Sequence, residues 1–332
     1  MQVLIVTEAD VSIGLGHLKR CSILAKEAKN QGLEVAFYLL NSNLEAKGLV
    51  LKMGYALSDF NSLEDALRNR DYATVIIDVR DEVIFPNKIN ILIEKQNTLL
   101  IDDISSRNMF AKYSLFTPAG SIGQYENFDN GVEVFGGWEY LIVNHYKKLA
   151  NSPKDCDLLF NFGASDPYLL SELILLRSKH IVAKYKCKLI LGPLVTPDRE
   201  REILELARES NCEVVQNPLD FHSLIASSKL VIGSFGNLFY ESILIGTPII
   251  SIYKSYSEIQ TLKQDRNLQD LHFFEKSVIE KGSNSSDSIL FIEAIEDMNL
   301  KINNNYEFKF NRINIGGGDK RIIDKILSNS IR

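Results

Sequence analysis

Short apolar runs alternate with longer amphipathic stretches along most of the chain. Residues 2–7 (QVLIVT) form a nearly continuous apolar run, which is typical of a strand buried on both faces. Residues 17–31 then carry apolar side chains at helical spacing, and Gly32 follows where a glycine commonly ends a helix. The same alternation predicts strands at residues 34–40, 74–78 and 98–102, with helices at residues 63–69 and 88–96. This order predicts a doubly wound, parallel α/β sheet.

A polar segment at residues 143–156 interrupts the alternation and indicates a linker. Beyond it the pattern predicts strands at residues 157–162, 187–191, 213–215, 230–232 and 248–253, helices at 169–184 and 197–210, and a polar loop at 283–288. We therefore expect two α/β domains, at residues 1–150 and 151–315, facing each other across a cleft. Three glycines, 316–318, precede a last helix near 319–327, and we expect residues 316–332 to pack back on the first domain.

The composition narrows the class of protein. The 332 residues are enough for two domains, and an apolar content of 45% is ordinary for a globular chain. The 37 basic and 43 acidic residues give a net charge of −6, which argues against a sequence-independent nucleic-acid binder. No apolar run approaches the roughly 18 residues of a membrane span, and residues 1–10 lack the pattern of a signal peptide. We expect a cytoplasmic protein without nucleic-acid partners.

Metal and redox motifs do not occur in the sequence. The four cysteines, at positions 21, 156, 187 and 212, never form CxxC, which fits a reducing compartment. Asp102 and Asp103 are adjacent carboxylates, but neighbours on a strand point to opposite faces. The histidines at positions 145, 180, 222 and 272 are each isolated, and no HExxH spacing occurs. We therefore expect neither a metal site nor a cofactor.

Three turns carry the residues that we expect to contact a ligand. The first joins the first predicted strand to the first helix and contains Gly14, Gly16 and His17. Its glycines allow close backbone approach, and the helix start offers unpaired N–H groups. It is not a GxGxxG fingerprint, because Lys19 stands in place of the third glycine. His17 is a candidate general base, and the equally supported alternative is an ordinary histidine in the first turn of a helix.

The second turn is FNFGASDP at residues 160–167, which opens the second half of the chain. Gly163 permits a tight exit from the strand, and Asp166 followed by Pro167 predicts the N-cap and first residue of a helix. Capping alone explains these two residues. The functional alternative is that the amides and the Ser165 hydroxyl hold a phosphate or a sugar, and we weigh the two interpretations equally.

The third turn follows a predicted strand at residues 230–232 and leads into a helix that starts near Asn237. Gly233 and Gly236 lie in the turn, and backbone N–H groups at such a helix start suit a diphosphate. Glu241 lies four residues after Asn237, so both side chains can face one ligand, and its carboxylate can accept hydrogen bonds from two ribose hydroxyls. The alternative is that Glu241 only complements the helix dipole. The small, apolar character of this helix favours the functional interpretation.

With these turns in place, the chain resembles the pseudaminic-acid-pathway nucleotide-sugar hydrolases. That family includes spore-coat polysaccharide proteins and is related to the lipid-II-forming N-acetylglucosaminyltransferases. IGLGHLKR resembles the family's Gly-x-Gly-His-x-x-Arg opening, and FNFGASDP resembles its Phe-Gly-Gly-Ser-Asp turn. GNLFYESILIGTPII resembles its nucleotide-binding stretch, and INIGGGDKRIIDKIL resembles its C-terminal Gly-x-x-Arg segment. The similar stretches run from residue 11 to about residue 328.

The resemblance implies a GT-B-like fold of two Rossmann-like domains, with the sugar on the N-terminal side and the nucleotide on the C-terminal side. It implies a UDP-sugar substrate, a water positioned by His17, and departure of UDP without a metal or cofactor. The residues expected to contact the sugar are Gly14, Gly16, Arg20, Asp78, Gly163, Ser165, Asp166 and Gln260. The residues expected to bind the nucleotide are Gly233, Ser234, Gly236, Asn237, Leu238 and Glu241.

Three positions depart from the family pattern. The family usually has a tyrosine shortly after the aspartate that ends its third strand, whereas Val79 and Arg80 follow Asp78 here. Asn144 stands where the family's Tyr-x-x-x-Arg segment has its arginine, and Gln260 is the nearest candidate for a missing Asn-Gln pair. The nucleotide side of the site is therefore better supported than the sugar side.

Three functions follow from this pattern. The first is a UDP-sugar hydrolase that supplies a free amino or deoxy sugar for surface-polysaccharide or nonulosonic-acid synthesis. The second is a glycosyltransferase that uses the same donor site with an alcohol acceptor. The third is a catalytically silent nucleotide-sugar binder.

Overall fold

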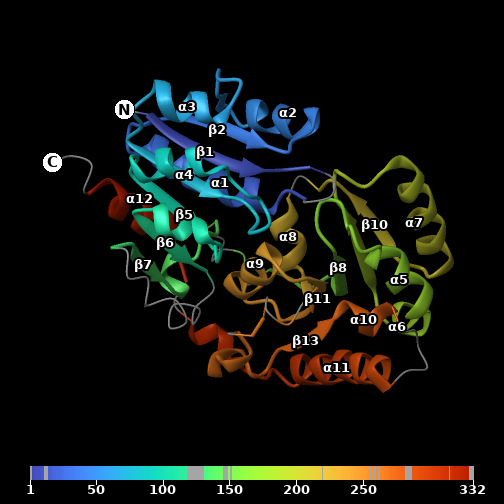
Figure 1. The fold of residues 1–332 in the computed structure, drawn as a ribbon. Coiled ribbons are helices and arrows are strands. Elements are labelled where there is room, and N and C mark those ends of the chain that lie inside the picture. The colour runs from blue at the N-terminus through green and yellow to red at the C-terminus, as the bar shows by residue number, and fades with distance from the viewer. Residues whose placement is uncertain are drawn as a thin grey trace. The chain divides into compact units, whose positions relative to one another are not determined.

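The computed structural model describes residues 2–10, 14–117, 131–144, 149, 152–218, 220–254, 256, 259–260, 262–280, 286–313 and 315–328. The chain forms two compact units (Figure 1). Unit 1 consists of Met1–Asn144 and Asn314–Arg332, and unit 2 is His145–Ile313. Each unit has a parallel sheet of its own, so the predicted doubly wound α/β architecture is confirmed.

The sheet of unit 1 has seven parallel strands in the order β3-β2-β1-β4-β5-β6-β7. Their bounds are β1 (Gln2–Glu8), β2 (Glu34–Leu40), β3 (Ala56–Leu57), β4 (Thr74–Asp78), β5 (Thr98–Ile101), β6 (Tyr113–Phe116) and β7 (Glu133–Gly136). The central strands are buried apolar runs, as the sequence predicts for a sheet covered on both faces. In the register of this sheet, Thr7 of β1 lies opposite Asp78 of β4.

Helices cover both faces of this sheet. They are α1 (Gly16–Asn30), α2 (Leu44–Lys52), α3 (Leu63–Asn69), α4 (Asn87–Glu94) and α12 (Gly318–Leu327), with 3-10 turns η1 (Ser106–Phe110) and η3 (Trp138–Tyr140). Leu4, Val6 and Ile77 belong to the core packed with α3 and α4. Because side chains alternate along a strand, Asp78 turns to the other face, where α1 lies.

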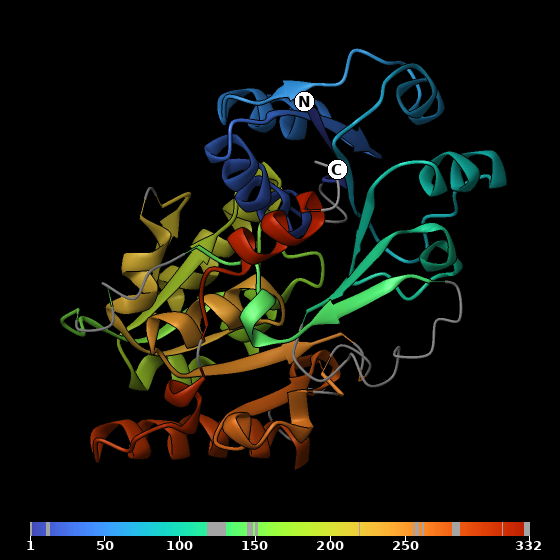
Figure 2. The same ribbon diagram turned by 90° about the vertical axis from the view of Figure 1, so that its left-hand side faces the viewer.

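The last helix, α12, packs on α1 within unit 1, and Figure 2 shows the two side by side. Its buried face includes Ile322, Ile323 and Ile326. The Nε2 of Gln31 donates to the Asp324 carboxylate at 2.7 Å. A Cβ on Gly318 would lie 2.3 Å from the Leu141 carbonyl oxygen, so this approach requires glycine.

The sheet of unit 2 has six parallel strands in the order β10-β9-β8-β11-β12-β13. Their bounds are β8 (Cys156–Asn161), β9 (Cys187–Leu191), β10 (Glu213–Gln216), β11 (Ser228–Ser234), β12 (Ile249–Tyr253) and β13 (His272–Glu275). The helices are α5 (Leu170–Arg177), α6 (Lys179–Lys184), α7 (Pro197–Glu209), α8 (Phe221–Ala226), α9 (Asn237–Ile245), α10 (Lys276–Glu280) and α11 (Ser286–Asn303). The 3-10 turns of this unit are η6 (Leu262–Gln264), η7 (Arg266–Leu268) and η8 (Lys309–Arg312).

Most of the predicted strands of unit 2 differ from the observed ones by one or two residues at their ends. Two other predicted elements differ more. The single helix expected over residues 169–184 is two helices, because the backbone of Ser178 leaves the helical region (φ −115°) between α5 and α6. The polar loop expected over residues 283–288 ends earlier, because α11 begins at Ser286, and residues 283–285 lie outside the described residues. Short polar residues at 286–288 therefore start a helix rather than continue a loop.

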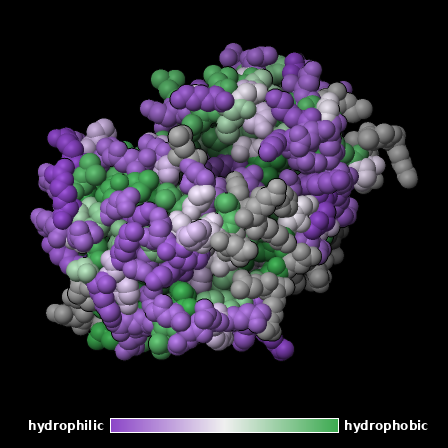
Figure 3. All heavy atoms as spheres, turned by 180° about the vertical axis from the view of Figure 1, so that it is seen from behind, coloured by the Kyte–Doolittle hydropathy of each residue, from purple (hydrophilic) through white to green (hydrophobic). Residues whose placement is uncertain are grey.

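Polar side chains cover most of the face in Figure 3, between smaller groups of hydrophobic ones. Isolated exposed hydrophobic residues are normal for a globular surface and need no partner. Among the helices in the described ranges, none combines the length and the apolar character of a bilayer-spanning segment.

Candidate active site

Each sheet has one position where the direction of strand order reverses, called its switch point below. In unit 1 it lies between β1 and β4, and in unit 2 between β8 and β11. Open α/β sheets bind ligands outside the carboxyl ends of the strands at this position. All three turns singled out in the sequence follow strands that flank these switch points. The structure therefore gives each unit one candidate ligand-binding edge.

At the switch point of unit 1, His17 and Asp78 form a hydrogen-bonded pair. His17 is the second residue of α1, and its Nδ1 lies 2.7 Å from Asp78 Oδ1. The His17 side chain is 26% exposed, whereas Asp78 is fully buried. Only the histidine of this pair is open to a ligand. Residues 11–13 of the same turn lie outside the described residues.

Arg20 holds Asp78 from the next turn of α1. Its Nε donates to Asp78 Oδ2 at 2.8 Å and its second terminal nitrogen donates to Asp78 Oδ1 at 2.6 Å, a bidentate pairing. Burial by itself raises the pKa of Asp78, but the charges of Arg20 and His17 outweigh it and hold this pKa well below its usual range. Burial lowers the pKa of Arg20, and Asp78 and Asp102 raise it well above its usual value. Both groups are therefore ionised at neutral pH.

Asp102 and Thr117 complete the support of Arg20. Asp102 follows β5 in a left-handed conformation (φ 51°), and its carboxylate accepts a hydrogen bond from the remaining terminal nitrogen of Arg20. The Thr117 hydroxyl donates to Asp102 at 2.6 Å. Asp103 instead binds Arg107. Both aspartates follow β5, which ends at Ile101, so the alternation of side chains expected along a strand does not apply to them.

These contacts change the roles expected for two residues. Asp78 was expected to contact the sugar, but it has no exposed surface, and its carboxylate is occupied by His17 and Arg20. Arg20 is also among the residues expected to contact the sugar, but its guanidinium is occupied by the two aspartates. In this geometry Asp78 contacts His17, and Arg20 contacts Asp78. The sequence could not show this because the partners are about 60 residues apart.

The pairing fixes the chemistry that His17 can perform. An ionised carboxylate only accepts hydrogen bonds, so the proton between His17 and Asp78 resides on Nδ1 of the histidine. The neutral imidazole then carries its lone pair on Nε2, and Nε2 can take a proton from a bound hydroxyl group. Asp78 stabilises the imidazolium that forms, as the aspartate does in hydrolytic triads. Among the described residues, no three His, Cys, Asp or Glu side chains gather as a metal site requires.

The switch point of unit 2 is built from glycine turns. A Cβ on Gly233 would lie 2.3 Å from the Asn161 carbonyl oxygen and 2.3 Å from Leu238 Cδ2. Gly233 is therefore required for the close packing of β11 on β8 and on the buried Leu238, and its predicted role in nucleotide binding stays a prediction. Gly236 has φ 146° with open space around its Cβ position, so it needs glycine for its backbone conformation.

Gly236 starts α9, whose N-terminal end lies at the carboxyl end of β11. Ser234 donates a hydrogen bond to the Phe162 carbonyl at 3.4 Å, which joins this turn to the one after β8. Asn237 is half-buried in the first turn of α9. The described contacts do not test the predicted role of Ser234, Gly236 and Asn237 in nucleotide binding, so this role stays a prediction.

Glu241 is buried one turn further along α9, and His222 of α8 lies beside it. The Nε2 of His222 is 3.4 Å from Glu241 Oε1. In the sequence His222 is isolated, because nothing in the spacing of these two residues indicates contact. His272 likewise lies 3.3 Å from Asp297. His145 and the side chain of His180 lie outside the described residues.

The turn after β8 is braced by Arg199 of α7. The Asp166 carboxylate accepts hydrogen bonds from the backbone N–H groups of Leu170 and Ser171, so it caps the start of α5 from outside the helix. The prediction of Asp166 as the N-cap and Pro167 as the first helical residue is wrong, because the N-cap residue is Leu169 and α5 begins at Leu170. Arg199 donates to the carbonyls of Ser165 and Asp166 at 2.9 Å each. The Ser165 hydroxyl is buried without a hydrogen-bond partner among the described residues. Capping thus explains Asp166, and Ser165 stays a ligand candidate.

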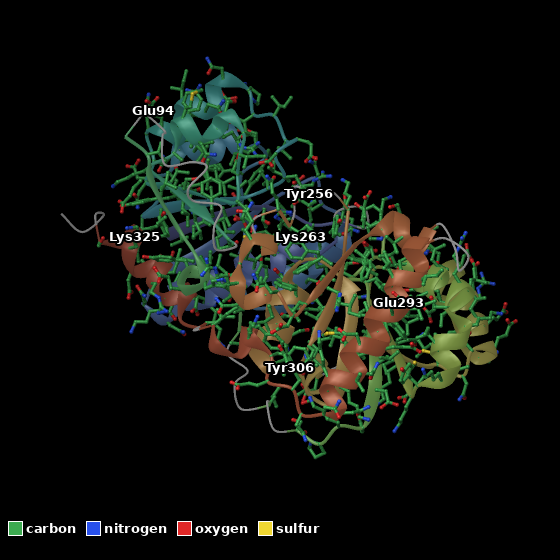
Figure 4. The ribbon with its side chains drawn as sticks, turned by 90° about the horizontal axis from the view of Figure 1, so that it is seen from below. Glu94, Tyr256, Lys263, Glu293, Tyr306 and Lys325 are labelled. Atoms are coloured by element: carbon green, nitrogen blue, oxygen red, sulfur yellow. The ribbon has the colours of Figure 1, made fainter. Side chains whose placement is uncertain are left out.

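The remaining predicted contacts are glycines and Gln260. Gly14 has φ 82° and donates its N–H to the Asp10 carbonyl at 2.8 Å, and Gly16 begins α1 with open space at its Cβ position. Gly163 has φ 94°, which provides the tight exit from β8 that the sequence predicts. Gln260 is exposed between Tyr256 and Lys263. Figure 4 labels these last two, and the Lys263 ammonium lies 5.4 Å from the Tyr256 ring centroid.

Comparison with known sequences gives matches without a stated activity. Residues 172–317 match the family described as "Protein of unknown function (DUF354)". The uncharacterized protein MJ1062 of Methanocaldococcus jannaschii is 23% identical over 273 residues. That match covers 77% of this chain and 56% of the relative, so the chain spans little more than half the relative's length.

Solved structures share the fold over nearly the whole chain. MurG of Acinetobacter baumannii superposes with a TM-score of 0.64 at 11% identity, covering 99% of this chain and 100% of that one. The UDP-GlcNAc 2-epimerase of Neisseria meningitidis, bound to UDP-GlcNAc, gives 0.61 at 13% identity, covering 99% and 100%. The spinosyn rhamnosyltransferase SpnG, complexed with thymidine diphosphate, gives 0.57 at 10% identity, covering 99% and 96%. These likenesses confirm the predicted GT-B-like fold.

Proposed function

We propose that this protein is a nucleotide-sugar enzyme that hydrolyses a UDP-sugar to UDP and a free sugar. The observation that carries this proposal is the His17–Asp78 pair at the switch point of unit 1. It presents an imidazole with a buried anionic partner, which is the arrangement of a general base. We assign the attack at the sugar to His17 and the binding of the diphosphate to the switch point of unit 2.

In the proposed reaction, water attacks the anomeric carbon as the bond to the diphosphate oxygen breaks. Nε2 of His17 accepts the proton that the water loses. The Asp78 carboxylate, held by Arg20, stabilises the resulting imidazolium. UDP leaves as a stable anion and needs little acid assistance, so we assign no step to a metal.

Two features of unit 2 support the assignment of the nucleotide. The N-terminal end of α9 directs backbone N–H groups and a positive dipole toward the turn at Gly236, and this arrangement suits a diphosphate. Glu241 supplies a carboxylate one turn away that can accept hydrogen bonds from ribose hydroxyls. Two proteins of the same fold are described with a nucleoside diphosphate or a UDP-sugar bound.

The sequence resemblance supports hydrolysis as the first candidate. The Gly-x-Gly-His-x-x-Arg opening places its histidine and arginine at His17 and Arg20, the two residues that meet at Asp78. On this basis the product is a free amino or deoxy sugar for surface-polysaccharide or nonulosonic-acid synthesis.

Transfer of the sugar to an alcohol is the second candidate function. Nε2 of His17 can deprotonate an alcohol by the same geometry that serves water. A rhamnosyltransferase is among the proteins that share this fold. In a transferase, UDP release accelerates when an acceptor is added, whereas a hydrolase releases UDP from the donor alone.

The test is to incubate the protein with a panel of UDP-sugars, without acceptor, and to measure UDP release. We expect one UDP-sugar to be hydrolysed and His17→Asn to lower kcat by about 10²–10⁴-fold, the usual contribution of a general base. Calorimetry should show UDP binding nearly unchanged in this variant, because the nucleotide is assigned to unit 2. His272→Asn is the matched control, since His272 forms a His–Asp pair away from both switch points.

Two outcomes would contradict the proposal. Full turnover by His17→Asn would make the histidine structural. UDP binding without turnover of any UDP-sugar, with or without acceptors, would favour the silent binder.

A further inference from the structure

A pocket of about 420 Å³ opens in unit 1 beside the loop that follows β4. Its lining is mostly apolar and includes Leu63, Ile84, Phe85 and Ile89. This volume lies within the usual range of small-molecule sites, roughly 300–1,000 Å³. Ile84 is 88% exposed, so its side chain is open to a ligand at the mouth of this pocket.

At the carboxyl ends of β1 and β4, the pocket lies on the sheet face that α3 and α4 cover, and His17 lies on the face that α1 covers. Glu8 ends β1 on the face that α3 and α4 cover, and it contacts Asn41 and Arg80 of the pocket lining. Asp78 ends the neighbouring strand β4 and turns to the α1 face, where it meets His17. Only Val79 separates Asp78 from Arg80 along the chain. The pocket and His17 therefore flank the carboxyl end of the same strand, β4.

Two buried charged residues hold the walls of the pocket. Glu8 is fully buried, and its carboxylate accepts hydrogen bonds from Arg80 N at 3.0 Å and Asn41 Nδ2 at 3.1 Å. Arg107 is 3% exposed. Its guanidinium donates to the Arg80 carbonyl oxygen at 3.1 Å and also to the Val83 carbonyl oxygen.

Burial of an ion costs several kcal/mol unless its partners compensate. Neither Glu8 nor Arg107 takes part in the proposed chemistry, and both hold the same loop. A loop that is fixed in this way is preorganised for a ligand, because little conformational freedom is left to lose on binding.

The charges of the pocket define the ligand that it accepts. The guanidinium of Arg80 is paired with Glu8, with its second terminal nitrogen 3.3 Å from Glu8 Oε1, so the pocket has no spare positive charge from this residue. Glu82 is the other charged residue of the lining and adds a negative charge. A phosphate or carboxylate is therefore disfavoured.

We propose that this pocket binds an uncharged, mainly apolar group of the compound on which His17 acts. The role rests on the proposed function, whereas the binding itself does not. Two sources supply such a group: an apolar substituent on the sugar, or an alcohol acceptor.

The test uses straight-chain alcohols from butan-1-ol to hexan-1-ol as probes, with the full chain labelled at its isoleucine methyl groups for NMR. The Ile84 and Ile89 signals should shift on titration, while Ile91, which is exposed on the same helix as Ile89 but outside the lining, should not. Each added methylene should tighten binding about fourfold. Hexanoate, which has the same chain length and a negative charge, should bind at least about tenfold more weakly, since Glu82 repels it.

Variants distinguish binding in this pocket from nonspecific hydrophobic binding elsewhere on the surface. Ile84→Ser should weaken hexan-1-ol binding about fivefold, because the exposed side chain leaves the fold intact but removes apolar contact. Ile91→Ser is the matched control and should bind normally. Equal shifts at Ile91, equal binding of hexanoate, or unchanged binding by Ile84→Ser would each overturn the proposal.

Turnover assays then distinguish the source of the group. Hexan-1-ol that accelerates UDP release and forms a hexyl glycoside identifies an acceptor site. Competitive inhibition of UDP release identifies a site for a sugar substituent. Binding with no effect on turnover would overturn the link to His17. If no UDP-sugar is turned over at all, the proposed function fails, while the NMR titration still decides whether the pocket binds.

Discussion

The two switch points have the same topology but are built from different parts of the chain. In unit 1 the edge is made of side chains: His17 and Arg20 of α1, Asp78 at the end of β4 and Asp102 just after β5 form one hydrogen-bonded network. In unit 2 it is made mainly of backbone, with Gly163 and Gly236 in glycine conformations and an apolar helix behind them.

This difference matches the two tasks of the proposed reaction. A proton acceptor must be a titratable side chain held in one orientation, and a buried ionic network provides that orientation. A diphosphate is best met by several N–H groups at once, and a glycine turn before a helix provides those. We therefore expect charge-removing variants to damage unit 1 most and Cβ-adding variants to damage unit 2 most.

The largest effect is expected from Asp78→Asn. This change removes one partner of the buried Arg20 and leaves an incompletely paired charge, so unit 1 should lose roughly 3–5 kcal/mol of stability. Urea unfolding measures this loss. Asp59→Asn, at an exposed position, is the control and should be nearly neutral. A loss below about 1 kcal/mol would mean that the network contributes little to stability.

The difference in stability between the wild type and Asp78→Asn should depend on pH in a defined way. Because the pKa of Asp78 is lower in the folded protein than in the unfolded chain, its stabilisation is complete above the unfolded value of about 4. It is lost only as the pH falls further, toward the folded value. Urea titrations should therefore show a constant advantage of the wild type over Asp78→Asn from about pH 8 to about pH 5, which narrows below about pH 4. An advantage that already shrinks near neutral pH would contradict this sign.

A smaller effect, on binding, is expected from Glu241→Ala in unit 2. Loss of charge-assisted hydrogen bonds to ribose should weaken UDP binding by roughly 1.5–3 kcal/mol in calorimetry. His222→Gln keeps a polar side chain beside Glu241 and should change the affinity less. Equal losses in both variants would show that Glu241 acts through His222 and not on the nucleotide.

The smallest of these effects is expected from adding a Cβ in unit 2. Gly233→Ala places that atom 2.3 Å from a carbonyl oxygen, so unit 2 should lose about 1–3 kcal/mol, an ordinary cost of overpacking. Gly48→Ala is the control in unit 1, because Gly48 lies within α2 with open space around it, and it should gain roughly 0.5–1 kcal/mol. Unfolding midpoints in urea compare the two. A neutral Gly233→Ala would contradict the close packing of β11 on β8.

Most of the fold could be predicted from apolar periodicity. The bounds of β2, β4, β9 and α3 agree with the sequence analysis, because each is an apolar run limited by turn residues. The four-residue strands β6, β7 and β13 were missed. Runs this short carry too little periodicity to be distinguished from loops.

The candidate site could be predicted only as separate residues. His17 and Asp78 were both singled out, but their pairing depends on β1 and β4 being neighbours, which periodicity does not show. Asp102 was set aside as half of an adjacent pair, and its left-handed backbone, which turns it toward Arg20, has no signature in the sequence. Tertiary contacts, not local propensity, assemble this network.

The return of α12 to α1 has a consequence for how the chain folds during synthesis. Unit 1 consists of two segments separated by all of unit 2, so its first segment leaves the ribosome long before its last helix exists. Until then the apolar side of α1 that α12 covers has no partner from this chain, and unit 2 can fold in the meantime. Helix α12 thus completes a unit whose strands are all made before unit 2. If synthesis stops before α12 is made, the polypeptide exposes the apolar side of α1. Chaperones and proteases act on chains with such exposed apolar surfaces.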